Sequence, residues 1–316
     1  MEQTRKCISI AVPTYNEAEN VVPLTQAILA QFKEHLPEYD AEILFIDNAS
    51  SDGTREKLRA LCAEHACVKA IFNAANFGQF NSPYYGLCQT TGDCAILLCA
   101  DFQDPVELIP TLVAKWEAGE QVVCAVKTKS RENFLVRAMR SCYYKLLGAM
   151  SRVRQIPHFT GFGLYDRRFI EVLRAMNDPA PYLRGIVAEY APNAVTVPYV
   201  QPRRRAGKSS NGFSTLYDAA MLGFTTYTKL PVRAMTFFGV LFLLASLVCG
   251  AFALAQGLSG ESYQLFTLLA AIGFFGAVNL LAISVVGEYL LAAAKKNSRR
   301  PLVVEECRIN FEKEGQ

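Results

Sequence analysis

The sequence predicts an α/β domain built on a mainly parallel sheet, followed by a hairpin of two membrane-spanning helices. Two observations carry this prediction. From residue 1 to about residue 212, short apolar runs of strand length alternate with helical patterns, as in a parallel sheet with helices on both faces. After residue 233 there are two uncharged runs, and each is long enough to cross a bilayer.

Five apolar runs are the candidate strands. They lie at residues 7–12, 42–46, 68–72, 94–99 and 122–126. Helical patterns separate them, and these lie at residues 17–35, 53–64, 79–91 and 105–118. Strands of this length, bounded by turn residues and separated by helices, are typical of βαβ units, in which neighbouring strands run parallel.

The composition restricts the class of protein. Hydrophobic residues make up 51% of the 316 residues, and charged residues only 19%, against roughly 25% in an ordinary soluble domain. The 32 Lys and Arg against 29 Asp and Glu leave a net charge of +3, which is not the strongly basic character of a nucleic-acid-binding domain. We therefore expect no nucleic-acid partner. An aromatic content of 11% also excludes a disordered chain.

The excess of apolar residues lies near the C-terminus. Residues 234–260 and 262–287 contain no charged side chain, and about 20 apolar residues suffice to span the hydrocarbon layer as a helix. The alternative, two buried helices of a soluble core, would normally show polar positions at every turn. We therefore expect transmembrane helices at 234–257 and 264–291.

The basic residues beside these runs predict their orientation. Lys229 and Arg233 precede the first run, Lys and Arg at 295–300 follow the second, and the short connection between the runs has neither. By the positive-inside rule, both ends lie in the cytoplasm, at the inner membrane of the cell or its equivalent. The expected order is a cytoplasmic catalytic domain at 1–212, an interfacial amphipathic helix at 213–233, the two spans, and a cytoplasmic tail at 292–316.

Acidic and amide side chains follow three of the predicted strands. They are Glu17 after the first strand, Asp47 and Asp52 after the second, and Asp101, Gln103 and Asp104 after the fourth. Each loop also has a structural explanation, since Asp52 begins a turn and Asp104 precedes a helix start. However, the carboxyl ends of parallel strands meet at one edge of the sheet, where ligands bind. Carboxylate and amide oxygens there are suited to Mg²⁺ or Mn²⁺.

Further motifs occur in a fixed order along nearly the whole chain. They are VPTYNE at 12–17, ID at 46–47 with SDGT at 51–54, NFGQ at 76–79, TGD at 91–93, ADFQDP at 100–105, TGFGLYDR at 160–167 and GEYL at 287–290. This ordered set resembles family 2 glycosyltransferases with a GT-A type, Rossmann-like catalytic domain. More narrowly, it resembles the polyprenyl-phosphate glycosyltransferases, such as bactoprenol glucosyltransferases and dolichol-phosphate mannose synthases. The resemblance implies an enzyme, a hexosyltransferase.

The resemblance also implies roles for particular residues. The nucleotide-sugar would be bound by Pro13, Tyr15, Glu17, Asp47, Asp52, Arg204 and Ser209. Asp101 and Gln103 would hold Mg²⁺ or Mn²⁺ on the diphosphate, and the catalytic residues would be Asp101, Asp104 and Arg204. The acidic motif of the family usually reads Asp-x-Asp, and its first position here is Cys99. A thiol is a poor ligand for Mg²⁺, so either Asp101 and Gln103 contribute more or Mn²⁺ is preferred.

A basic stretch follows the last predicted strand. From Lys127 to Arg154 there are eight Lys or Arg and one acid. One interpretation is a solvated helix on anionic lipid, where each basic residue contributes about 1 kcal/mol. The resemblance implies instead that Arg137 and Ser141, one helical turn apart, bind the phosphate of a lipid acceptor.

A second basic stretch covers residues 203–209. It matches the pattern Arg-x-x-Gly-x-Ser of the family at Arg204, Gly207 and Ser209. Guanidinium groups bind phosphate through paired hydrogen bonds. This stretch therefore suits a loop that closes over the donor diphosphate.

The resemblance implies the transfer of one sugar from a nucleotide-sugar to undecaprenyl or dolichyl phosphate at the cytoplasmic membrane face. UDP-hexose is favoured as the donor, with GDP-mannose as the alternative. A phosphate monoester is largely dianionic at pH 7 and can attack without a protein base. A single in-line displacement then inverts the anomeric carbon.

Other functions are less consistent with the sequence. A catalytically silent scaffold that binds nucleotide-sugar at the membrane would explain Cys99, but not the retained acids and basic stretches. A processive polysaccharide synthase would carry a Gln-x-x-Arg-Trp motif, and the single Trp, Trp116, follows Lys115. The sequence leaves open the sugar, the length of the lipid and the oligomeric state, with a homo-oligomer among the alternatives.

Overall fold

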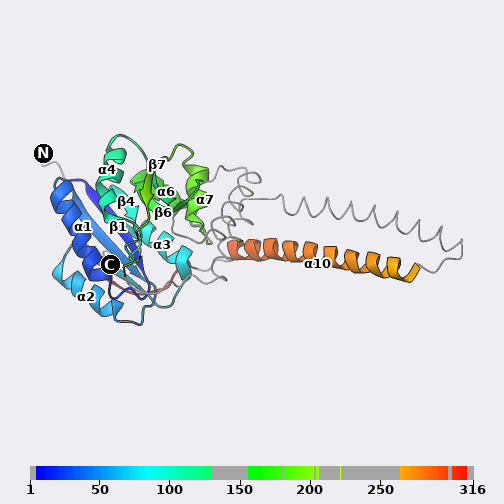
Figure 1. Ribbon diagram of the computed structural model, residues 1–316. Helices are drawn as coiled ribbons and strands as arrows, with labels where there is room; N and C mark the ends of the chain where they lie inside the picture. The colour runs from blue at the N-terminus through cyan, green and yellow to red at the C-terminus, as the bar shows by residue number, and fades with distance from the viewer. Residues whose placement is uncertain are drawn as a thin grey trace.

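A twisted eight-stranded sheet forms the centre of the domain, and one long helix extends away from it (Figure 1). The computed structural model describes residues 5–129, 156–179, 181–202, 204–205, 221, 264–297 and 301–311. The strands are β1 (Cys7–Thr14), β2 (Asp40–Asp47), β3 (Val68–Asn73), β4 (Cys94–Leu97), β5 (Val122–Lys129), β6 (Phe159–Asp166), β7 (Val195–Val200) and β8 (Glu305–Ile309).

The sheet has the strand order β7-β5-β6-β4-β1-β2-β3-β8. Strands β4, β1, β2 and β3 run parallel, as do β5 and β7. Antiparallel pairs join β6 to β4 and β5, and β8 to β3. The prediction of a mainly parallel α/β sheet is therefore confirmed, and β1 to β5 are the five strands expected from the apolar runs.

Helices cover both faces of this sheet. They are α1 (Val21–His35), α2 (Thr54–Glu64), α3 (Gly78–Gln89), the short 3₁₀ helix η1 (Val106–Leu108), α4 (Ile109–Glu117), α6 (Arg167–Met176) and α7 (Leu183–Tyr190). The first helix begins at Val21, later than expected, because Glu17 and Asn20 form a turn in which the Asn20 N–H donates to the Glu17 carbonyl at 2.9 Å. That turn leaves the Glu17 side chain on the loop after β1.

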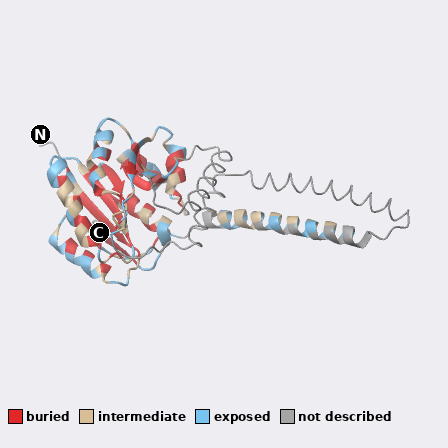
Figure 2. Cartoon of the chain, in the orientation of Figure 1, coloured by how far each residue is buried: buried red, intermediate tan, exposed pale blue. Residues whose placement is uncertain are grey.

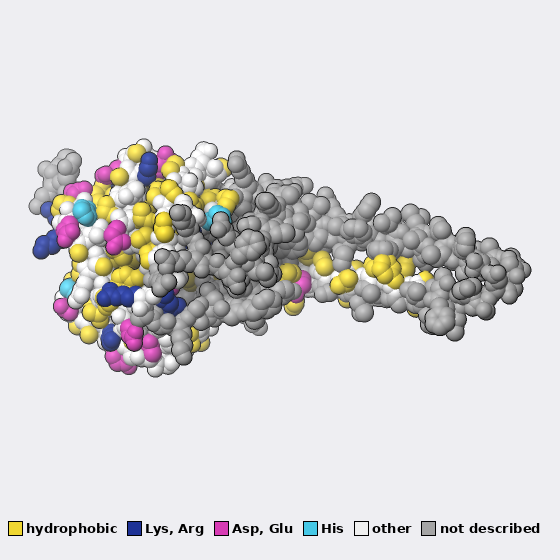
Figure 3. All heavy atoms as spheres, in the orientation of Figure 1, with side chains coloured by type: hydrophobic (Ala, Val, Ile, Leu, Met, Phe, Trp, Pro, Cys, Tyr) yellow, Lys and Arg dark blue, Asp and Glu magenta, His cyan; other side chains and the backbone are white. Residues whose placement is uncertain are grey.

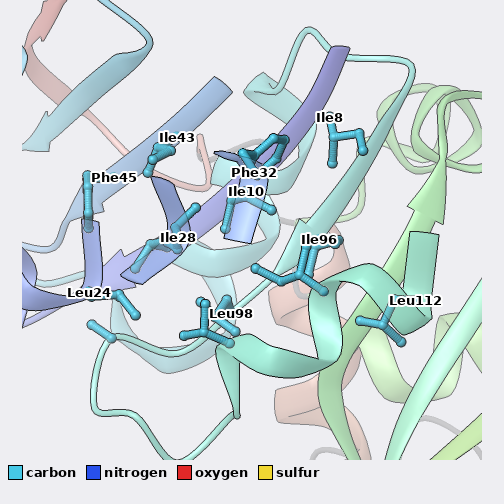
Figure 4. Close-up of a cluster of buried hydrophobic side chains, with 14 of the residues drawn as sticks. Ile8, Ile10, Leu24, Ile28, Phe32, Ile43, Phe45, Ile96, Leu98 and Leu112 are labelled. Atoms are coloured by element: carbon cyan, nitrogen blue, oxygen red, sulfur yellow. The ribbon is translucent and has the colours of Figure 1, made fainter. Parts of the chain in front are cut away.

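Side chains along each strand point alternately to the two faces of the sheet, and each face has its own hydrophobic core. On β1, Ile8, Ile10 and Val12 pack into one core, and Ala11 packs into the other, since successive side chains point to opposite faces. Figure 4 shows Ile8 and Ile10 beside residues of α1. The opposite core receives side chains from α3, α6 and α7. Figure 2 shows the central strands buried between these helical layers.

The C-terminal segment contributes a strand that the sequence analysis did not expect. Residues 292–316 were expected as a tail, and Glu305–Ile309 within it form β8, paired antiparallel with β3. The register joins Ala70 to Ile309 and Phe72 to Cys307. Residues at the far end of the chain therefore complete one edge of the sheet.

The long helix α10 (Gln264–Asn297) covers the segment expected as the second span. Among the described residues it contains the one segment long and apolar enough to cross a membrane, Phe274–Ala293. None of that segment is buried in the protein, and Figure 3 shows its hydrophobic side chains at the surface beyond the domain. Both the span expected at 234–257 and the interfacial helix expected at 213–233 lie outside the described part of the chain, apart from Met221. The two-helix hairpin is therefore not confirmed.

Candidate active site

A cavity of about 600 Å³ opens at the carboxyl ends of β1 and β4. The chain leaves β1 toward β2 on one side, while β4 lies on the other side. At such a reversal of strand order, the loops after the two strands diverge and leave a crevice that binds ligands in α/β proteins. The cavity is therefore where the sequence analysis expected the site.

The structure brings seven of the predicted site residues around this cavity. They are Pro13, Tyr15, Glu17, Asp101, Gln103, Asp104 and Arg204. They come from the end of β1 and the loop after it, from the loop after β4, and from the segment after β7. Tyr15 remains 41% exposed, so its ring is available to a ligand.

Arg204 connects two of these loops. One terminal nitrogen of its guanidinium donates to Oε1 of Glu17, and the other lies 3.7 Å from Oδ2 of Asp101. Burial raises the pKa of Glu17, against the lowering by the hydrogen bond from Asn20 and by the charge of Arg204. The guanidinium therefore balances two acids at the cavity wall and is positioned to contact an anionic ligand.

The loop that carries Asp101 and Gln103 is tightly turned. Oδ1 of Asp101 accepts from the backbone N–H of Gln103 at 3.1 Å. Between them, Phe102 has φ of 59°, in the left-handed region that costs an L-residue about 1–2 kcal/mol. The Arg205 guanidinium lies 5.1 Å from the centre of the Phe102 ring, and the Arg205 N–H donates to the Asp101 carbonyl at 3.4 Å. The segment after β7 thus holds this strained loop in place.

Asp104 is engaged within the protein. Its Oδ2 accepts from the Cys99 N–H at 3.1 Å and its Oδ1 from the Tyr199 hydroxyl at 2.9 Å. Burial raises the pKa of Asp104, and the charge of Lys127 opposes this effect. Lys127, noted in the sequence only as part of a basic stretch, also lines the cavity. Burial lowers the pKa of Lys127, against the raising by Asp104. We infer that Asp104 supports the loop and its neighbouring cation.

Asp47 and Asp52, which were predicted to bind the nucleotide-sugar, contact other parts of the protein in this structure. Asp52 accepts from the N–H groups of Ala18 and Thr54, each at 3.1 Å, and so joins the loop after β1 to the start of α2. Asp47 is fully buried, and its Oδ2 accepts from Arg55 Nε at 2.8 Å. Neither side chain belongs to the described cavity lining. Their contacts with a donor therefore stay predictions.

Asn48 is a lining residue that the sequence analysis missed. It follows Asp47 directly at the end of β2, and that position was the available signal. Its Nδ2 donates to Asn76 Oδ1 at 2.7 Å, and its Oδ1 accepts from the Phe77 N–H at 2.9 Å. The amide thus uses a donor and an acceptor to hold the turn before α3, where Gly78 also lines the cavity.

The described residues supply a small ligand set for a divalent cation. In that part of the chain, no group of three or more His, Cys, Asp or Glu is arranged to hold a metal ion. Asp101 and Gln103 offer one carboxylate and one amide at the cavity, and Cys99 is exposed beside them. Mg²⁺ commonly uses one or two carboxylates and takes its other ligands from substrate phosphates and water. The donor set fits a cation that arrives with a phosphate-bearing ligand.

Three predicted residues lie outside the described part of the chain. They are Arg137 and Ser141, expected at the acceptor phosphate, and Ser209, expected at the donor. Their roles stay predictions.

Comparison with known proteins gives consistent results. The model of the family described as Glycosyl transferase family 2 matches residues 9–191. Over 299 residues the chain is 31% identical to the bactoprenol glucosyl transferase of Shigella phage SfX, which covers 93% of this chain and 97% of that protein. It is 30% identical over 299 residues to a prophage bactoprenol glucosyl transferase homolog of Escherichia coli (strain K12), covering 93% and 96%.

Among solved structures, a mannosyltransferase from Pyrobaculum calidifontis in complex with GDP-Man and Mn²⁺ matches with a TM-score of 0.47 and 19% identity. The match covers 93% of this chain and 88% of that chain.

Proposed function

Because this chain belongs to glycosyl transferase family 2 and is a glycosyltransferase, we propose that it transfers one hexose from a nucleotide-sugar to a polyprenyl phosphate, with inversion. The observation that carries the proposal is the contact of Arg204 with both Glu17 and Asp101 at the cavity wall. Through this contact, one cation lies between the loop after β1 and the loop after β4, which carry residues expected to bind the nucleotide-sugar. Relatives with the name bactoprenol glucosyl transferase support a polyprenyl acceptor and favour UDP-hexose over GDP-mannose.

Different residues around the cavity are proposed to bind different parts of the nucleotide-sugar. Pro13 and the half-exposed Tyr15 provide an apolar surface for the nucleobase. Arg204 neutralises charge on the diphosphate as the bond to the sugar breaks, which is the usual source of catalysis in such transfers. Asp101 and Gln103 would hold Mg²⁺ or Mn²⁺, which would stabilise the same developing charge.

The acceptor needs little activation from the protein. Its phosphate is largely dianionic at neutral pH and is itself the nucleophile. No protein base is therefore required at the cavity. Arg137 and Ser141 are proposed to bind this phosphate, and Lys127 lies at the cavity on the strand that leads to them.

The exposed surface of α10 supports a membrane location. Its apolar side chains include Ile272, Ile283 and Leu290, which are 60%, 67% and 65% exposed. A long apolar helix whose described side chains are not buried in the protein is typical of a membrane span. At 1.5 Å per residue, its 34 residues extend for about 50 Å, more than the roughly 30 Å hydrocarbon layer.

The pairing of β8 with β3 supports an even number of crossings. One strand precedes α10 in the chain and the other follows it, and both belong to one sheet. Segments on the two sides of a spanning helix can pair only if the chain also returns across the membrane. We therefore propose that the span expected at 234–257 is the other crossing, which precedes α10 in the chain. By the positive-inside rule, the flanking Lys and Arg support a cytoplasmic location for the domain.

A direct assay tests the proposal. The full chain, purified in detergent, is incubated with undecaprenyl phosphate, Mg²⁺ or Mn²⁺ and a panel of nucleotide-sugars, and the lipid is examined by mass spectrometry. A gain of one hexose mass is expected, and the variant Asp101→Asn should not produce it. Exposed Glu107 supplies the matched control Glu107→Gln, which should retain activity. Nucleotide binding without any lipid product would instead support the catalytically silent scaffold.

A further inference from the structure

One arginine connects the C-terminal strand β8 to the carboxyl ends of β2 and β3. Arg55, on α2, donates from Nε to Asp47 Oδ2 at 2.8 Å, from one terminal nitrogen to the Asn73 carbonyl at 2.6 Å, and from the other to Glu306 Oε2 at 2.7 Å. The three acceptors belong to β2, β3 and β8. Because the guanidinium is planar and rigid, it fixes these acceptors relative to one another.

Asp47 depends on this arginine. Its side chain has no exposed surface, and Oδ2 accepts from Arg55 and from the Ser50 N–H at 3.1 Å. Its Oδ1 is buried without a hydrogen-bond partner among the described residues. A buried carboxylate needs a compensating charge, which Arg55 supplies. Its position therefore follows that of the guanidinium.

Short contacts transmit the position of Asp47 to the cavity wall. Ser50, whose N–H binds Asp47, accepts through Oγ from the Asn16 N–H at 2.8 Å. Asn48, the next residue after Asp47, donates from its N–H to the Thr14 carbonyl at 2.9 Å. Asn16, Asn48 and Thr14 all line the cavity. A displacement of Asp47 would therefore move the wall formed by the loops after β1 and β2.

We propose that Glu306 is a positioning residue for nucleotide binding, which holds Arg55 against Asp47 so that the C-terminal strand supports the cavity wall. The inference rests on the proposed function, in which this cavity binds a nucleotide. With Glu306 in place, both terminal nitrogens of Arg55 are engaged. Without it, one terminal nitrogen loses its acceptor, and the guanidinium, whose side chain is 22% exposed, is held only by Asp47 and the Asn73 carbonyl.

If Glu306 had a purely structural role, its loss would lower the thermal stability of the fold. Its side chain is 50% exposed, and exposed ion pairs contribute little to the stability of a fold. Loss of the Glu306 charge should therefore leave thermal unfolding unchanged and act on ligand affinity. Glu305 provides the matched control, since it lies next to Glu306 on β8 but pairs with Arg308.

The test measures the dissociation constants of UDP and GDP by calorimetry, with Mg²⁺, on the full chain in detergent. For the nucleotide that the wild type binds more tightly, Glu306→Gln is expected to weaken binding about 3- to 10-fold. Glu305→Gln, which removes one charge from the same strand, should leave binding unchanged. Arg55→Lys keeps the charge, but a single ammonium cannot contact three acceptors in the same way, so a larger loss is expected.

Equal affinity in wild type and Glu306→Gln would overturn the inference. An equal loss in Glu305→Gln, or a wild type that binds neither nucleotide, would do the same. Sugar transfer to lipid is measured separately. Absence of a lipid product, together with nucleotide binding that depends on Glu306, would refute the proposed transfer and leave this inference standing.

Discussion

Arg204 forms an ion pair with Glu17, although 187 positions separate them in the chain. The pair joins the segment after β7 to the loop after β1, and both residues line the cavity. Its guanidinium also lies near Asp101. A donor diphosphate would compete with these carboxylates for the same cation. Arg204 is therefore expected to exchange a protein anion for a ligand anion when the donor binds.

Removal of this cation should weaken donor binding strongly. Arg204→Gln is expected to raise the KM for the nucleotide-sugar about 10- to 100-fold, because hydrogen bonds to charged groups are the strong ones. Steady-state kinetics with varied donor and saturating lipid phosphate measures this change. Arg168, exposed on α6, supplies the charge-matched control Arg168→Gln. A comparable rise in the control would show that only the net charge matters.

Replacement of Cys99 tests the metal assignment. Cys99→Asp adds a carboxylate beside Asp101 and Gln103, and hard Mg²⁺ prefers oxygen ligands to a thiol. The Mg²⁺ concentration for half-maximal transfer should fall by at least about tenfold, as expected for changes around a metal site. Metal titrations with Mg²⁺ and Mn²⁺ measure the change, and Cys99→Ser is the size-matched control. An unchanged Mg²⁺ requirement in Cys99→Asp would count against a cation at this position.

Glu42, near the amino-terminal end of β2, predicts a pH dependence of stability. Its carboxylate, 3% exposed, accepts from Ser9, from Lys69 at 2.8 Å, and from the N–H and hydroxyl of Thr91 at 2.8 and 2.7 Å. Burial by itself would raise the pKa of Glu42, but these hydrogen bonds outweigh it and hold the pKa below its usual value of 4.5. The stabilisation is therefore present above pH 4.5 and is lost as the pH falls through the folded-state pKa.

Glu42→Gln should lower the free energy of unfolding by about 2 kcal/mol at pH 7, since bonds to a charged acceptor are lost. At pH 3 the difference from wild type should shrink. Thermal unfolding of both proteins at the two pH values tests this. Glu34, whose side chain is 66% exposed on α1, supplies the control Glu34→Gln, which should have no effect at either pH. A constant difference between the two pH values would contradict the lowered pKa.

A charge in the middle of α10 should oppose membrane insertion. Ile283, 67% exposed, lies near the centre of the apolar segment, where a lysine costs about 3 kcal/mol. Ile283→Lys is expected to reduce the fraction of protein retained in carbonate-washed membranes. Ala293→Lys is the control, because at the end of the segment a lysine can extend its ammonium to the interface. Full retention of Ile283→Lys would argue against a span.

Local patterns in the sequence were enough to predict most of the sheet. The apolar runs at β1 to β5 and the helices between them follow from periodicity, which each segment carries by itself. β6 was noted only as a motif, because its two glycines interrupt the apolar run. β8 was missed because an edge strand with charged side chains shows little apolar alternation.

The sequence by itself determined the class of fold, the edge of the sheet that carries the site, and most of the acids at the cavity. Strand length, helix period and the loops that follow strands are properties of contiguous residues. Only the tertiary structure decided that Arg204 reaches Glu17, that Asp47 turns to Arg55, and that Lys127 faces the cavity. These contacts join segments far apart in the chain, and their energies depend on burial and on the partners available in the folded state. Patterns within a short stretch of sequence therefore cannot predict these contacts.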